Sequence, residues 1–221
     1  MSKQNPRLPK DAFSLLAELV ANNNRDWYHE HKKLIKLNLI DPFANILEHV
    51  SKNLKRTAYP LQGSRKTMFR LNRDTRFSKN KKPYKENIGG LLTPSGIKNE
   101  ANGLVYLHLD TTSSMVAAGF YRFSANQLEP LRQRMIVEPK QWRMVKRALF
   151  KAELDLERTS QLKSMPRGFI AYSEHEHSDD LKLKNLIVQR SLPKRAWLSS
   201  VVVDQVTTFA QAVRPLLQFK S

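Results

Sequence analysis

The sequence predicts an α+β fold, in which N-terminal helices pack on a mainly antiparallel sheet and further helices follow toward the C-terminus. Three observations predict it. Apolar residues recur at helical spacing in the first third of the chain, alternate with polar residues in the middle, and return to helical spacing after residue 124. With 221 residues and 40% hydrophobic content, the chain can bury a full core. We expect one domain over residues 1–221, with 160–166 as the candidate boundary if it divides.

Three helices are expected by residue 56. The first carries the apolar residues of 13–20 and follows Pro9, a residue favoured in a first turn. Asn24 has the side chain to cap the second helix. The third is expected to begin with Asp41 as its N-cap and Pro42 as its first helical residue, because proline suits that position.

The middle of the chain changes to strands and turns. Two strands are predicted over 104–109 and 115–120, joined as a hairpin by 110–114. Gly89-Gly90 and residues 93–96 are interpreted as turns, because both contain glycine. The alternation along the first of these strands predicts a sheet with one covered face. It sets three apolar residues against three polar ones: Val105, Leu107 and Leu109 against Tyr106, His108 and Asp110.

The C-terminal half returns to helices. One is expected after Ser124 and another from Pro139, each with apolar residues at helical spacing. A short strand is predicted over 186–188, and a closing helix over 201–217.

Composition narrows the classes of function. Lys and Arg number 38 against 20 Asp and Glu, a formal net charge of +18 that favours an anionic partner. Cysteine is absent, which excludes disulfides, thiolate metal sites and a cysteine nucleophile. The N-terminus lacks a signal-peptide core, and no stretch approaches the ~18 apolar residues of a membrane span. We therefore expect a cytoplasmic protein without a membrane span.

The positive charge is concentrated between residues 65 and 85. This segment holds nine Lys or Arg residues and one acidic residue, Asp74, whereas the rest of the chain holds 29 basic and 19 acidic residues. Whether the segment is extended or helical, Asp74 lies beside at least one arginine. A carboxylate that holds a guanidinium fixes that arginine to bind a second anion. The candidate ligand-binding residues are Arg70, Arg73, Asp74, Arg76, Lys82, Tyr84 and Lys85.

These residues carry a resemblance to a known family. The segments RLNRDTRFS (70–78) and KPYK (82–85), with NNNRDWY (22–28) before them and PRGF (166–169) after them, resemble domain of unknown function 2461. The resemblance extends through both predicted middle strands and so covers most of the chain. Asn80 stands where the family is expected to have aspartate. The resemblance implies no assigned activity.

Three hypotheses follow for the basic segment. The leading one is binding of a phosphate-bearing ligand, of which nucleic acid is one candidate. The alternative is an enzyme acting on a phosphorylated or carboxylated small molecule, with Asp74 as the candidate acid–base group. In the third, the arginines form internal ion pairs and Tyr84 belongs to the core. Convergence of Arg73, Asp74, Arg76 and Tyr84 in a closed pocket would favour the enzyme, and an open basic groove would favour nucleic acid.

The other motifs in the sequence give weaker evidence for a function. Residues 174–177 alternate Glu and His, which invites a metal hypothesis, yet no further histidine-rich partner is apparent and no metal or cofactor is predicted. Gly89-Gly90 lacks the Lys-Ser/Thr of a P-loop, and no Gly-x-Ser-x-Gly elbow occurs. The sequence therefore predicts a binding surface more clearly than a reaction.

Overall fold

The computed structural model describes residues 6–220 and confirms the α+β fold. Its sheet is antiparallel throughout, with strands in the order β1-β2-β3-β4. The strands are β1 (Ile88–Leu92), β2 (Leu104–Leu109), β3 (Met115–Phe120) and β4 (Leu186–Ser191). The helices are α1 (Ala12–Ala21), α2 (Arg25–Ile35), α3 (Asp41–Leu54), α4 (Ala125–Val137), α5 (Pro139–Lys151), α6 (Ser178–Leu181), α7 (Lys194–Trp197), α8 (Val201–Ala212) and α9 (Arg214–Leu217).

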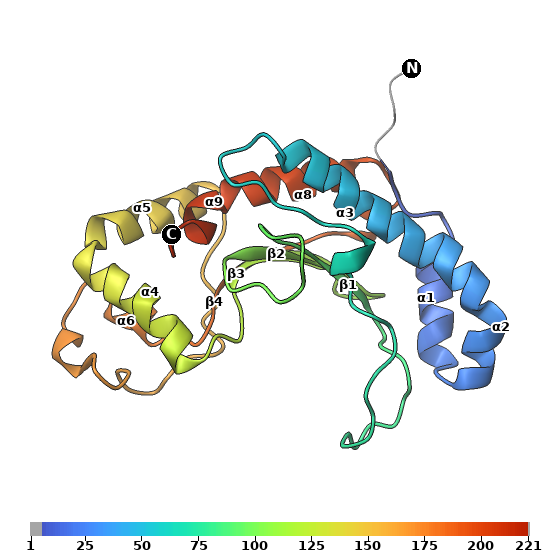
Figure 1. Ribbon diagram of the computed structural model, residues 1–221, viewed down its shortest axis with the longest axis horizontal. Coiled ribbons are helices and arrows are strands. Elements are labelled where there is room, and N and C mark those ends of the chain that lie inside the picture. The colour runs from blue at the N-terminus through green and yellow to red at the C-terminus, as the bar shows by residue number, and fades with distance from the viewer. Residues whose placement is uncertain (1–5, 221) are drawn as a thin grey trace.

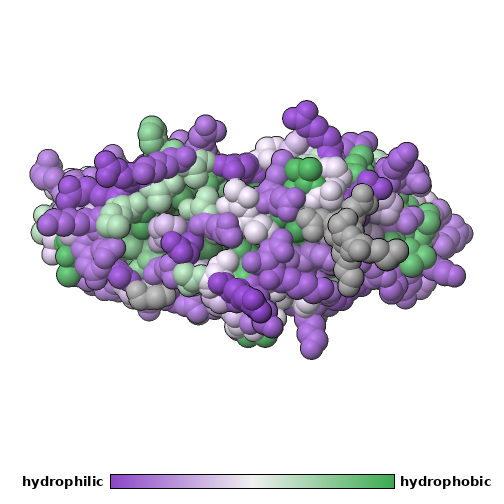
Figure 2. Space-filling model, turned by 90° about the horizontal axis from the view of Figure 1, so that it is seen from above, coloured by the Kyte–Doolittle hydropathy of each residue, from purple (hydrophilic) through white to green (hydrophobic). Residues whose placement is uncertain are grey.

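Within the described residues, helices cover only one face of the sheet. Figure 1 shows α3 and α8 side by side above the strands, with α1 and α2 at one end and α4 to α6 at the other. The apolar residues that alternate along β2 are buried beneath these helices, which confirms the predicted covered face. Between α3 and α7, Phe43 stacks on Trp197 with ring centroids 5.7 Å apart. The outer surface above the helices is mainly hydrophilic (Figure 2).

The third helix begins at Asp41, close to the predicted start, but the N-cap role predicted for Asp41 is wrong. A π-helical turn, Lys36–Ile40, joins α2 to α3, and the Asp41 amide donates to the carbonyl of Lys36. Asp41 is therefore inside a continuous helical run and is not an N-cap. In a regular α-helix the ring of Pro42 would meet the carbonyl four residues earlier, and the wider turn relieves that clash. The cap predicted for α2 is confirmed, because Asn24 Oδ1 accepts from the Trp27 amide at 3.0 Å.

The predicted turn at Gly89-Gly90 is also wrong, because both residues lie in β1. A Cβ on Gly89 would lie 2.7 Å from the Tyr106 hydroxyl, and one on Gly90 would lie 2.6 Å from a methyl of Leu47. These glycines are there for close packing on the two sheet faces and not for a turn. The turn at 93–96 is present, with Gly96 at φ +72°.

The remaining predicted elements are confirmed with small changes. β2, β3 and the starts of α4 and α5 fall where they were expected, and Ser124 caps α4. β4 continues three residues beyond the predicted 186–188. The expected closing helix over 201–217 is divided at Val213 into α8 and α9, because Pro215 lacks the amide needed to continue the ladder.

Between α3 and β1 the chain forms an extended arm, which we define as residues 71–85. Its two halves pair through the Arg73 amide to the Pro83 carbonyl and the Lys85 amide to the Leu71 carbonyl, both at 2.8 Å. Figure 1 shows the arm projecting below the uncovered face of the sheet. Near its tip, the Phe77 side chain is 95% exposed.

The arm is anchored at its base to the N-terminal helices. The side chain of Asn23 accepts from the Tyr84 amide and donates to the Tyr84 carbonyl, at 3.0 and 3.1 Å. The ring of Tyr84 stacks on Tyr28 with centroids 4.0 Å apart. Within residues 6–220, the structure contains no helix of the length and apolarity that a membrane crossing requires.

Candidate ligand-binding groove

The uncovered face of the sheet is the floor of a groove of about 700 Å³. Figure 1 shows the underside of the sheet, with the base of the arm on one side and α4 to α6 on the other. The groove is lined by Phe69, Lys85, Asn87, Leu91, Leu104, Tyr106, His108, Met115, Ala117, Ala118, Gly119, Tyr121, Arg122, Glu157, Ile187 and Gln189. Among these described residues Glu157 is the only carboxylate, so the lining is mostly apolar with a positive excess.

Strand register and small side chains create the hollow. Tyr106 of β2 pairs with Ala117 of β3, which in turn pairs with Gln189 of β4. The next pairing along β3 toward the same face is Gly119 with Ile187. Because Ala117 and Gly119 offer almost no side chain, the middle of the floor is lower than its borders.

Tyr106 and His108 of β2, together with Asp110 directly after the strand, form a hydrogen-bonded row that begins on this floor. The Tyr106 hydroxyl is 2.9 Å from His108 Nδ1, and His108 Nε2 is 3.1 Å from Asp110 Oδ2. The Asn87 amide nitrogen also lies 3.3 Å from His108 Nδ1. An ionised carboxylate only accepts, so His108 carries its proton on Nε2, and Nδ1 accepts from the Tyr106 hydroxyl. We call Tyr106, His108 and Asp110 the relay.

The environment sets the charges of the relay. Burial tends to raise the pKa of Asp110, but hydrogen bonds from Ser113, Thr112 and His108 outweigh it and lower the pKa from 3.8 to about 2. Burial is also the main cause that raises the pKa of Tyr106. At neutral pH the relay therefore holds an ionised Asp110 and a protonated Tyr106.

Asp110 predicts an acid-dependent loss of stability. Its folded pKa lies below its ordinary value, so its contribution is complete above about pH 4 and is lost as the pH falls toward 2. The difference corresponds to about 2 kcal/mol. Denaturant titrations from pH 6 to pH 2 should show Asp110→Asn losing less unfolding free energy than wild type. Parallel pH profiles for the two proteins would contradict this assignment.

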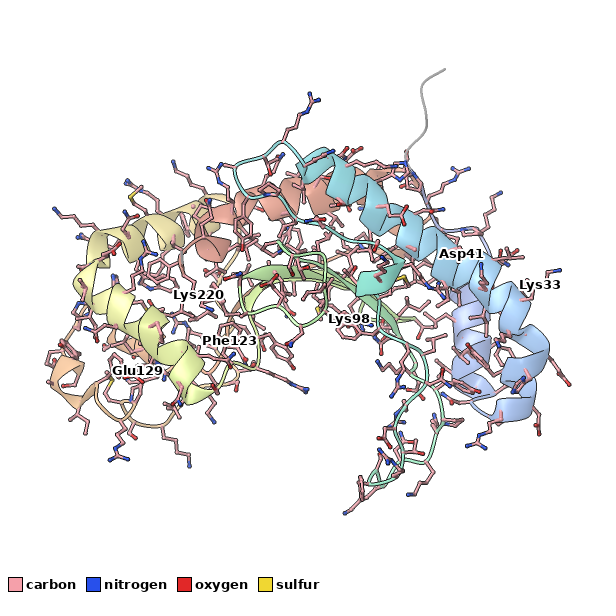
Figure 3. The ribbon with its side chains drawn as sticks, viewed as in Figure 1. Lys33, Asp41, Lys98, Phe123, Glu129 and Lys220 are labelled. Carbon is pink, nitrogen blue, oxygen red and sulfur yellow. The ribbon has the colours of Figure 1, made fainter. Side chains whose placement is uncertain are left out.

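Three cations lie near one another at the base of the arm, and one of them, Lys85, lines the groove. Burial lowers the pKa of Lys85, and repulsion from Arg70 and Lys98 lowers it further. Between residues 6 and 220, none of the three forms an ion pair, and Lys98 donates to the Met68 carbonyl at 3.2 Å. Figure 3 shows Lys98 below the sheet, beside the arm. We call Arg70, Lys85 and Lys98 the rim cations; an anion placed beside Lys85 would offset the repulsion that it experiences from the other two.

A further cation, Arg122, lies at the opposite end of the groove. Arg122 follows β3 with φ +56°, an uncommon conformation for a non-glycine residue, and its amide donates to Asn185 Oδ1 at 2.8 Å. Its guanidinium lies 5.2 Å from the ring centroid of Tyr121. Next to it, Phe123 lies near Lys220, whose ammonium is 5.5 Å from the ring centroid (Figure 3). Aromatic rings and cations therefore also meet at this end.

The structure brings some of the predicted ligand-binding residues together. Asp74 accepts from Arg76 at 3.0 and 2.7 Å, which confirms a carboxylate beside an arginine. This hydrogen bonding lowers the pKa of the exposed Asp74. Arg73 instead donates to the Lys82 carbonyl at 3.3 Å and to Ser78 at 3.4 Å.

Other predicted residues lie apart from that pair. Tyr84 is only 4% exposed and packs on Tyr28, so it supports the arm from within the core. Lys82 pairs with Glu86 at 2.6 Å. Asn80, where an aspartate was expected, accepts from the Lys82 amide at 2.9 Å, a role that needs no charge.

Ion pairs account for little of the basic segment. Among the described residues, three of its nine cations have a carboxylate partner, namely Arg65 with Asp41, Arg76 with Asp74 and Lys82 with Glu86. All six side chains are at least 37% exposed, so such pairs contribute little to stability. The surplus positive charge faces solvent on the arm and at the groove.

The relay and Lys98 were missed by reasoning from the sequence. The alternation along β2 did place Tyr106, His108 and Asp110 on one face, but that face was interpreted only as the uncovered side of a sheet. No local pattern in the sequence relates Lys98 to Lys85, because the whole β1 strand lies between them in the chain. At 174–177, His177 is 1% exposed beside Pro139, and residues 6–220 contain no group of three metal-ligating side chains.

Comparison with known proteins identifies one family. The family model described as "Conserved hypothetical protein (DUF2461)" matches residues 11–219, nearly the whole chain. No curated protein and no solved structure matches.

Proposed function

Because the chain belongs to the DUF2461 family, whose description names no activity, we propose a function from the geometry. The groove and the arm bind a phosphate-bearing ligand, and single-stranded nucleic acid is the ligand that fits best. The observation that carries this proposal is the placement of the three rim cations beside an aromatic floor.

The distribution of charge favours phosphate. Arg70 and Lys98 both repel Lys85, and the segment 65–85, which includes Arg70 and Lys85, has a net charge of +8. A ligand that spans the rim and the arm would meet cations along its length. Repeated negative charge is the property of a nucleic-acid backbone.

The aromatic rings of the groove favour a ligand with exposed bases. Phe69 and Tyr121 are 38% and 55% exposed at the two ends of the groove, and Tyr106 lies between them on the floor. Lys85 lies 5.1 Å from the Phe69 ring centroid, so a cation and a stacking surface are adjacent. Stacking on such rings contributes about 1–3 kcal/mol per base. Bases in a duplex are already stacked, which favours a single strand.

The shape of the site favours one of the two functions considered from the sequence over the other. Asp74 and Arg76 lie on an exposed arm and Tyr84 is buried, so the predicted residues do not converge in a closed pocket. The groove is open along the sheet, which favours an extended ligand. Its volume of about 700 Å³ also suits a small phosphorylated molecule, which is the second candidate.

Binding of a labelled single-stranded oligonucleotide, followed by fluorescence anisotropy, tests the proposal. Arg70→Ala/Lys98→Ala is expected to weaken binding and to reduce the slope of log affinity against log salt by about 1.4, since each phosphate contact on a single strand contributes about 0.7. Lys33→Ala/Lys140→Ala removes the same charge from the exposed surfaces of α2 and α5 and is the matched control. Equal losses in both double variants would contradict a specific groove.

The arm is tested separately. Arg73→Ala/Arg76→Ala should weaken binding of an oligonucleotide long enough to reach beyond the groove, and should not affect a dinucleotide. Phe77→Ala tests whether the exposed ring at the tip adds a stacking contact. If neither variant changes affinity for the long oligonucleotide, the arm takes no part in binding.

A further inference from the structure

The relay has the order of groups that activates a nucleophile. A hydroxyl is hydrogen-bonded to an imidazole nitrogen, and the other imidazole nitrogen is held by an ionised carboxylate. This is the arrangement of nucleophile, base and orienting group found when a weak nucleophile must be activated at neutral pH. Alternate positions place all three on one face of the sheet, because residues two apart in a strand share a face, and Tyr106 and His108 line the groove.

Packing holds the phenol in place without hiding it. The Tyr106 ring lies across Gly89, where a Cβ would come within 2.8 Å of the ring and 2.7 Å of the hydroxyl. Phe69 meets the ring edge-on with centroids 6.1 Å apart. Tyr106 and His108 both line the groove, while the His108 and Asp110 side chains are each 18% exposed. A purely structural hydrogen bond would not need this access.

We propose that the relay makes the groove a catalytic site for phosphodiesters, with Tyr106 as the nucleophile, His108 as the base and Asp110 as the positioning residue. The inference takes its substrate class from the proposed function. Asp74 takes no part in the chemistry, and Lys85 is the one residue of the arm that does.

The step balances without a further reactant. The phenolic oxygen of Tyr106 forms a bond to phosphorus, and its proton passes to Nδ1 of His108. The bond from phosphorus to the leaving sugar oxygen breaks with its electron pair, and that oxygen takes the proton from His108. The transient imidazolium is stabilised by Asp110, and Lys85, which lies over the neighbouring Phe69 ring, is placed to offset charge on the phosphate oxygens. Attack by water or by a nucleic-acid hydroxyl then releases Tyr106.

The activated diester bis(p-nitrophenyl) phosphate tests the chemistry independently of nucleic-acid binding. Wild-type protein is expected to release p-nitrophenolate in a burst approaching one equivalent, and to gain the mass of the p-nitrophenyl phosphoryl group on Tyr106. Tyr106→Phe should lose both signals and keep its melting temperature within a few degrees. His108→Gln should slow the burst by about 10²-fold or more. Tyr172→Phe, which alters a tyrosine outside the groove, is the matched control.

The outcomes separate the two proposals. A burst that persists in Tyr106→Phe, or a modification on another residue, would overturn the relay as a catalytic site. Oligonucleotide binding by wild type without any burst would also overturn it and would leave the binding function intact. A burst without oligonucleotide binding would support the relay and remove nucleic acid as the ligand.

Discussion

Replacing Asp180 with alanine is expected to lower the free energy of unfolding by about 3 kcal/mol. Asp180 is 2% exposed and accepts from Trp142 Nε1 at 2.8 Å and from Arg158 at 2.7 Å, with Lys146 at 3.1 Å. Alanine would leave the indole N–H of the buried Trp142 without its acceptor and two cations without their counter-charge. Unsatisfied buried groups of this kind are among the costliest single changes.

The neighbouring residue supplies the control. Asp179 is 78% exposed and, among residues 6–220, pairs only with Lys182, so Asp179→Ala should change stability by less than about 1 kcal/mol. For a chain of this size, 1 kcal/mol corresponds to about 2–4 °C. Thermal melts should therefore show a drop of roughly 6–12 °C for Asp180→Ala. Equal melting temperatures for the two variants would contradict the stabilising role of the contacts that Asp180 makes with Trp142, Lys146 and Arg158.

Gly119→Ala is expected to be at least as damaging, at about 4 kcal/mol or more. Gly119 has φ +130°, and a Cβ there would lie 1.9 Å from the carbonyl oxygen of Leu186 on β4. The positive φ and the contact with the Leu186 carbonyl both involve backbone atoms, so the movement of a side chain cannot relieve either of them. The β3 and β4 strands would have to separate, which would also deform the groove floor.

Gly168→Ala distinguishes the clash from the backbone conformation. Gly168 also has a positive φ, +84°, but a Cβ there meets nothing within 4 Å. Its substitution should cost only the conformational penalty of about 1–2 kcal/mol. Denaturant titrations of both variants make the comparison, and a similar loss in each would mean that crowding at Gly119 contributes nothing.

Local patterns explain which parts of the fold could be predicted. β2 and β3 follow from alternation and a short hairpin, and the Asn24 cap follows from one side chain and one amide three residues later. Asp74 and Arg76 are two residues apart, so their contact was expected in any extended geometry. Each of these features depends on residues close together in the chain.

The errors arise where distant residues decide. Gly89-Gly90 has the composition of a turn, and only the ring of Tyr106 and the helix above explain why glycines occupy a strand. The missed π turn before Asp41 is the exception, because it accommodates the ring of the adjacent Pro42. The rim cations come from both sides of β1, so their proximity is a property of the fold. The candidate site was therefore only half visible in the sequence, as a basic segment without its aromatic floor.

Photocrosslinking of a single-stranded oligonucleotide that contains 5-bromodeoxyuridine, followed by mapping of the modified peptides, tests the central claim most directly. The groove predicts crosslinks at its aromatic residues Phe69, Tyr106 and Tyr121. Added unlabelled oligonucleotide should suppress them. Crosslinks confined to α3 and α8, on the opposite face of the sheet, would show that nucleic acid binds elsewhere and would contradict the account.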